Sequence, residues 1–97
     1  MIASNEALAT IDGMDSRQRK TLEVIFAKPT AANLQWDRIE SLLCAAGCTV
    51  IEGSGSRVRF ALGEAVATFH RPHPAREAKK YQVDDARAFL TTIGVTP

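Results

Sequence analysis

The strict alternation of residues 57–62, Arg-Val-Arg-Phe-Ala-Leu, is the feature that most restricts the fold of this chain. Successive side chains of a β-strand point to opposite faces, so the pattern predicts a strand with apolar side chains on one face and arginines on the other. A tight turn, Gly-Glu at 63–64, joins it to a second predicted strand, residues 65–70. Residues 48–52 are rich in strand formers and end at the Gly-Ser-Gly of 53–55, which predicts one more strand before these two.

Two amphipathic segments precede the strands and predict helices. Residues 17–27 place apolar side chains on one side, and Ser16 is the candidate N-cap. A second helix is predicted to begin after Asn33, a plausible cap, and to end at Gly47. Its apolar side chains recur at helical spacing: Trp36, Ile39, Leu42, Leu43 and Ala46. Trp36 falls on this stripe, so we interpret it as a core residue.

A last helix follows the strands. Asp84 and Asp85 favour its start, because acidic side chains complement the helix dipole there, and Gly94 closes it. Its apolar stripe consists of Val83, Ala86, Phe89, Leu90 and Ile93. The predicted order is therefore helix, helix, strand, strand, strand, helix.

The 97 residues predict one small α+β domain, residues 16–97, after a flexible lead-in of residues 1–15. A three-stranded antiparallel sheet in so small a domain can bury only one face against helices. If Val58 and Phe60 face the helices, Arg57, Arg59 and His70 share the open face, where they can meet a phosphate backbone.

The charge distribution favours a polyanionic partner. Residues 1–56 hold five Lys and Arg against seven Asp and Glu, whereas residues 57–97 hold seven against four. No apolar run approaches the roughly 20 residues that cross a bilayer, so we expect a cytoplasmic protein with no membrane partner. The Gly-Ser-Gly of 53–55 lacks the lysine and spacing of a phosphate loop, so we expect no nucleotide cofactor.

Cys44 and Cys48 lie four residues apart, far from either histidine. Because zinc usually needs four ligands, we expect no metal site but two reduced, largely buried thiols. A disulfide between them is the alternative.

Taken together, the motifs resemble the HicA toxin family, in the branch with an extra N-terminal helix (here residues 19–26). The resemblance covers roughly residues 17–97 and is carried by four segments in order: residues 33–43, Gly47, residues 53–60 and residues 69–74. It implies a fold similar to the double-stranded-RNA-binding domain. It also implies messenger RNA cleavage that halts translation, without a metal ion, and neutralisation by a HicB-type antitoxin encoded beside the toxin.

The chain departs from the family at one position. Typical members carry a catalytic histidine after a Gly-Ser pair, and Arg57 stands there in this sequence. Arginine stays protonated, so it cannot act as a general base. His70 and His73 are the remaining candidates for proton transfer, with Arg57 neutralising charge on the transferring phosphate.

Three hypotheses stay open: a ribonuclease whose catalysis has moved to His70, with His73; an RNA-binding module without cleavage; and a domain that only docks an acidic antitoxin. The predicted RNA contacts are Ser56, Arg59, Arg71, Lys79 and Lys80. Tyr81, beside the basic loop, is undecided between a plain surface residue and a base-stacking one.

Overall fold

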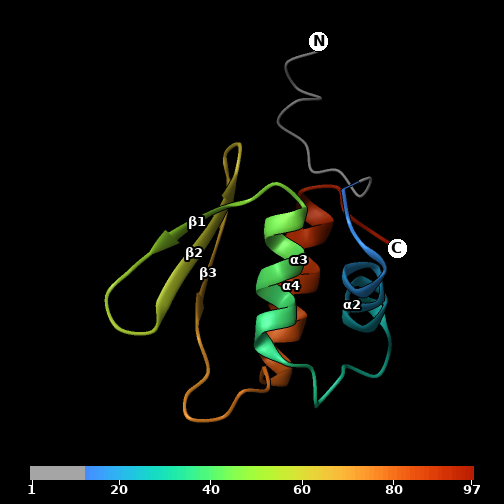
Figure 1. Ribbon diagram of the computed structural model, residues 1–97, viewed down its shortest axis with the longest axis horizontal. Helices are drawn as coiled ribbons and strands as arrows, with labels where there is room; N and C mark the ends of the chain where they lie inside the picture. The colour runs from blue at the N-terminus through green and yellow to red at the C-terminus, as the bar shows by residue number, and fades with distance from the viewer. Residues whose placement is uncertain (1–12) are drawn as a thin grey trace.

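The computed structural model describes residues 13–97, which form three helices and one three-stranded sheet in the predicted order. The elements are α2 (Ser16–Phe26), α3 (Trp36–Ala45), β1 (Thr49–Glu52), β2 (Arg57–Leu62), β3 (Ala65–His70) and α4 (Lys80–Thr92). Figure 1 shows α3 and α4 lying between the sheet and α2, so that all helices are on one side of the sheet. The predicted α+β architecture is confirmed.

The sheet is an antiparallel meander in the order β1-β2-β3. Its inner face carries Val58 and Phe60, which are fully buried, together with Phe69. The exposed side chains of Arg57 and Arg59 point the other way. The alternation of residues 57–62 therefore assigns the two faces as predicted.

An aromatic cluster joins α3 to the inner face of the sheet. The ring of Trp36 lies 5.2 Å from that of Phe69 and 6.4 Å from that of Phe60, centroid to centroid, in tilted arrangements. Phe60 and Phe69 meet edge to face at 5.9 Å. These are the separations at which aromatic pairs stabilise a core beyond their buried area, so Trp36 is a core residue, as predicted.

The N-terminus of α2 differs from the prediction. Asp15, not Ser16, is the N-cap: its side chain accepts the amide of Gln18 at 2.8 Å, and the Gln18 side chain accepts the amide of Asp15 at 2.9 Å. This reciprocal pair satisfies two amides at once, which a lone serine cannot do. Met14, placed in the lead-in by the sequence, is buried in the core; residues 1–12 of that predicted segment lie outside the described residues.

The starts of the other two helices also required correction. Asn33 does not cap α3. The helix begins at Trp36, whose amide donates to the carbonyl of Arg76 at 2.9 Å instead of to a side-chain cap. Asp84 and Asp85 do not start α4, which begins a turn earlier at Lys80. The long-range backbone bond to Arg76 takes the place of the expected cap of α3. At the start of α4, the side chain of Gln82, inside the helix, accepts the amide of Lys79. The helix ends are as predicted: Gly47 and Gly94 follow α3 and α4 with φ of +104° and +85°.

The two cysteines are free, and only one of them is buried. Cys48 is buried, and desolvation, with a smaller contribution from Cys44, raises its pKa to about 11. Cys44 is exposed, which corrects the expectation that both thiols are largely buried: it falls on the outward side of the last turn of α3. None of the helices in residues 13–97 is long and apolar enough to cross a membrane.

The capping pair of α2 generates a stability prediction. Replacing Asp15 with alanine removes the acceptor for the Gln18 amide and should lower the free energy of unfolding by about 1 kcal/mol. Ser16→Ala is the matched control, since Ser16 is exposed and makes no capping bond, and it should change stability by less than about 0.5 kcal/mol. Urea unfolding of both variants measures the difference; a larger loss in Ser16→Ala would contradict this account of the helix start.

Candidate functional site

The open face of the sheet brings together Arg57, His70 and Ser56. Arg57 and His70 are direct partners across β2 and β3. The Arg71 amide donates to the Ser56 carbonyl at 2.9 Å, so Arg57 and His70 form a pair that is flanked by ladder hydrogen bonds. Side chains of such pairs come close, with Cα atoms about 4.5 Å apart. Arg57 and His70 therefore occupy adjacent positions on the exposed face, and we call them the Arg57–His70 row.

Ser56 extends this row. Its Oγ lies 3.3 Å from Nδ1 of His70, and the direction of that hydrogen bond depends on the tautomer of the ring. If Nδ1 carries the proton and donates to Ser56, Nε2 is left free to accept a proton. The structure thus places three of the predicted site residues in one group. Arg59, opposite Thr68, is the next outward-facing residue of β2 after Arg57.

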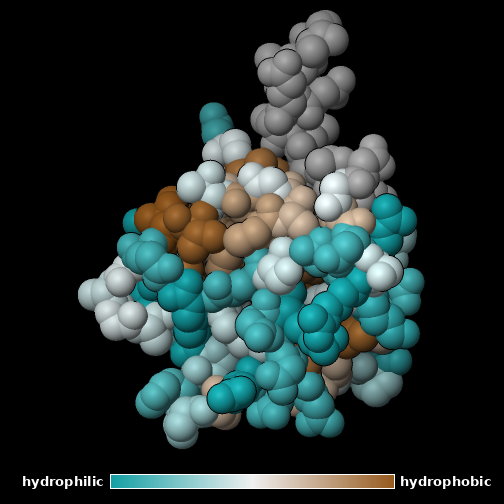
Figure 2. Space-filling model, in the orientation of Figure 1, coloured by the Kyte–Doolittle hydropathy of each residue, from teal (hydrophilic) through white to brown (hydrophobic). Residues whose placement is uncertain are grey.

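The electrostatics of this face favour an anion. The outward strand residues include no carboxylate: they are Thr49, Ile51, Arg57, Arg59, Ala61, Val66, Thr68 and His70. Neither Arg57 nor Arg59 forms an ion pair with any residue between 13 and 97. Ile51 and Val66 are exposed apolar side chains on the same face, and Figure 2 shows hydrophobic surface near β1 beside hydrophilic surface.

Of the remaining predicted site residues, only Arg71 is hydrogen-bonded to this group, through its backbone amide; His73, Lys79 and Lys80 are not. His73 is exposed in the loop after β3 and lines a shallow pocket with Trp36, Arg71 and Arg76. Lys79 and Lys80 are exposed at the start of α4. Within residues 13–97, no group of three or more His, Cys, Asp or Glu side chains is arranged to hold a metal ion.

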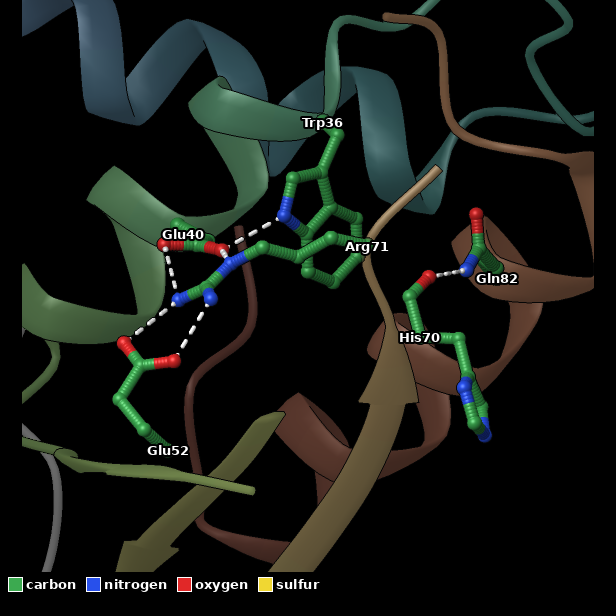
Figure 3. A network of polar contacts seen from close by, with 6 residues as sticks. All are labelled: Trp36, Glu40, Glu52, His70, Arg71 and Gln82. Carbon is green, nitrogen blue, oxygen red and sulfur yellow. Dashed lines mark hydrogen bonds and ion pairs between the residues drawn. The ribbon is translucent and has the colours of Figure 1, made fainter. Parts of the chain in front are cut away.

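Arg71 has protein partners on two elements (Figure 3). Its guanidinium binds both carboxylate oxygens of Glu52, at 2.7 and 3.0 Å, and also pairs with Glu40 of α3. Glu40 in turn accepts the indole N–H of Trp36 at 2.6 Å. The hydrogen bonds from Arg71 hold the pKa of Glu52 below its ordinary value, and both glutamates raise the pKa of Arg71. Arg71 therefore joins the end of β3 to α3 and β1.

Sequence reasoning missed this network, although one signal pointed to it. Glu52 has the same phase as Val50 in β1, which directs its carboxylate to the helix side of the sheet although the side chain stays 65 % exposed. The partner itself could not be identified, because Glu40 and Arg71 lie 12 and 19 residues away in different elements.

The loop that follows β3 is fixed at both of its ends. The Ala78 amide donates to the Leu34 carbonyl at 2.7 Å, and the side-chain amide of Gln82 donates to the His70 carbonyl at 2.7 Å (Figure 3). These two bonds thus hold the end of β3, which carries His70, and the loop after it against the helical layer. Chemically, the arrangement can bind a phosphate through guanidinium groups and exchange a proton through an imidazole.

Comparison with known protein families gave a match. A family model described as the HicA toxin of bacterial toxin–antitoxin matches residues 36–94, from the first residue of α3 to the glycine after α4. The matched segment includes the whole sheet and leaves α2 outside. Comparisons with curated proteins and with solved structures found no match.

The pairing of Glu52 with Arg71 predicts an acid-sensitive component of stability. Because the folded-state pKa of Glu52 is lowered, the folded chain binds fewer protons here than the unfolded chain, so this stabilisation is lost as pH falls through the folded-state pKa. Glu52→Gln should therefore show a smaller fall in Tm than the unmodified chain between about pH 5 and about pH 3. Glu64→Gln, in the hairpin turn, is the control, and its Tm should fall with pH as steeply as that of the unmodified chain. An equal fall of Tm with pH in all three proteins would contradict the role of the Glu52–Arg71 pair.

Proposed function

This chain belongs to the HicA toxin family of bacterial toxin–antitoxin systems, and on that premise we propose that it binds messenger RNA and cleaves it without a metal ion. The observation that carries the proposal is the Arg57–His70 row on the open face of the sheet. Cleavage of messenger RNA would inhibit translation, and the place of action would be the cytoplasm.

Binding is assigned to the cations of the open face. Arg57 and Arg59 have no carboxylate partner among the described residues, so their guanidinium groups are available to phosphate oxygens. Ser56 offers a hydroxyl beside them, and Lys79 and Lys80 can follow the RNA backbone at the start of α4. Arg71 was a predicted RNA contact, but its donors are engaged by Glu40 and Glu52, so we give it a role within the protein.

The proposed reaction is attack of an RNA 2′-hydroxyl on the adjacent phosphorus. Nε2 of His70 takes the hydroxyl proton while the new O2′–P bond forms, and Ser56 holds Nδ1 in the productive tautomer. The P–O5′ bond breaks, and the leaving oxygen takes a proton from His73 or from water. Arg57, on the neighbouring strand, stabilises the negative charge that develops on the phosphate oxygens.

A second candidate function is RNA binding without cleavage. It is favoured by Arg57, which occupies the position where the family resemblance implies a catalytic histidine and which cannot accept a proton. Such a protein would bind RNA in a salt-dependent way and leave it intact, because phosphate contacts release counterions whether or not a bond is broken.

Membership of the family implies an antitoxin partner. We propose that this partner is a HicB-type protein encoded beside the toxin. An acidic surface on it would complement the arginines of the open face and thereby block access of RNA.

The catalytic assignment predicts a specific loss on substitution. His70→Ala should lower the rate of RNA cleavage, measured with a chelator present, by roughly 10²- to 10⁴-fold, the usual contribution of a general base. Thr68→Ala is the matched control, because Thr68 is exposed on the same strand and face, and it should cleave at close to the original rate.

Two results would decide against the proposal. Undiminished cleavage by the double variant His70→Ala/His73→Ala would remove both histidines from catalysis. Intact RNA after long incubation with the unmodified chain, together with tight binding, would select the non-catalytic function.

A further inference from the structure

His70 is the last residue of β3, so the direction of its side chain depends on what holds the end of that strand. On one side, the Arg71 amide bonds to Ser56 and continues the ladder by one step. On the other side, the carbonyl of His70 itself accepts a hydrogen bond from Nε2 of Gln82, at 2.7 Å (Figure 3). The proposed catalytic residue is thus fixed through its own backbone by a side chain of α4.

Gln82 is suited to this task by its burial. It is 2 % exposed and is one of two buried polar residues in the described part of the chain, the other being Thr21 of α2. Its Nε2 donates to His70, and its Oε1 accepts the backbone amide of Lys79 at 3.0 Å. Both ends of the side-chain amide are therefore used, as a buried polar group requires.

The two bonds of Gln82 serve different purposes. The bond from the Lys79 amide satisfies the start of α4, and a glutamate at this helix position accepts it as well as a glutamine does. The bond to the His70 carbonyl needs a donor, which glutamine has and an ionised glutamate lacks. Helix capping alone therefore does not require an amide at residue 82, whereas holding His70 does.

We propose that Gln82 is a positioning residue that orients His70 in the Arg57–His70 row by binding its backbone carbonyl. The inference rests on the proposed ribonuclease function for its catalytic consequence. Gln82 does not touch the RNA; it acts through His70 and links the position of the imidazole to the start of α4.

Gln82→Glu separates the two bonds. It keeps the acceptor for Lys79 and replaces the donor to His70 with a carboxylate oxygen that repels the carbonyl. We expect kcat for RNA cleavage, per folded molecule, to fall by about 10- to 100-fold at pH 8, with KM within about twofold because the arginines are untouched. Lowering the pH to about 5 protonates the introduced buried carboxyl and restores a donor, so the ratio of the variant's kcat to that of the unmodified chain should rise. Dividing by kcat of the unmodified chain at the same pH removes the pH dependence that the two proteins share.

Two further variants complete the design. Gln82→Met removes both bonds without adding a charge; it should lower kcat at every pH, and it provides the same comparison if Gln82→Glu does not fold at neutral pH. Thr21→Val removes the Thr21 hydroxyl, which donates to Arg17, and so perturbs the other buried polar residue far from the sheet. It should lower stability and leave kcat unchanged.

NMR provides a readout that does not depend on cleavage. The ¹³C resonance of the His70 carbonyl and the NOE between the His70 ring and Ser56, whose Oγ lies 3.3 Å from Nδ1, should both change in Gln82→Glu and Gln82→Met, but not in Thr21→Val. Unchanged NMR signals and unchanged kcat in both Gln82 variants would overturn the inference. If the unmodified chain does not cleave RNA, the proposed function fails, and the NMR comparison still decides the positioning: a displaced His70 supports it and an undisturbed His70 overturns it.

Discussion

Within residues 13–97 the sheet has helices on one face only, and both the core and the candidate site depend on that constraint. The residues that face the helices include Phe60 and Phe69, which pack with Trp36. Because side chains alternate along a strand, burying these rings places Arg57 and His70 on the open face. A slip of one residue in register would bury arginines and expose aromatic rings. The packing energy of the core therefore also fixes the register of the site.

Polar contacts at the end of the sheet refine this arrangement without adding much stability. The side chain of Arg71 is 32 % exposed and that of Glu52 is 65 % exposed, and water weakens ion pairs at such exposure. Their value lies in geometry, since they join β1, β3 and α3 where β3 ends. The bond from Gln82 to His70 is different because its donor is buried, so an unpaired amide there would be costly.

Local patterns were sufficient for the order of the elements and for the two faces of the sheet, but not for the starts of the helices. The alternation of residues 57–62 correctly predicted the strand and its two faces, and together with the predicted strand 65–70 it placed arginine and histidine on the same face. Features that depend on distant partners were missed. For example, α3 does not begin directly after Asn33 but at Trp36, whose amide donates a hydrogen bond to the carbonyl of Arg76. The contacts of Arg71 and Gln82 likewise join elements far apart in the sequence, and no local pattern encodes them. The family resemblance identified the toxin family, and the sequence placed Arg57 and His70 on one face; that the two are direct partners across β2 and β3 comes from the structure.

The central claim is that an imidazole and a guanidinium on the open face support RNA cleavage by the 2′-hydroxyl of the RNA itself. That chemistry leaves a distinctive product, because the new O2′–P bond remains on the upstream fragment. Mass spectrometry of RNA fragments, produced in the presence of a chelator, tests it most directly. We expect 2′,3′-cyclic phosphate ends paired with 5′-hydroxyl ends, whereas 3′-hydroxyl ends paired with 5′-phosphates would contradict the account.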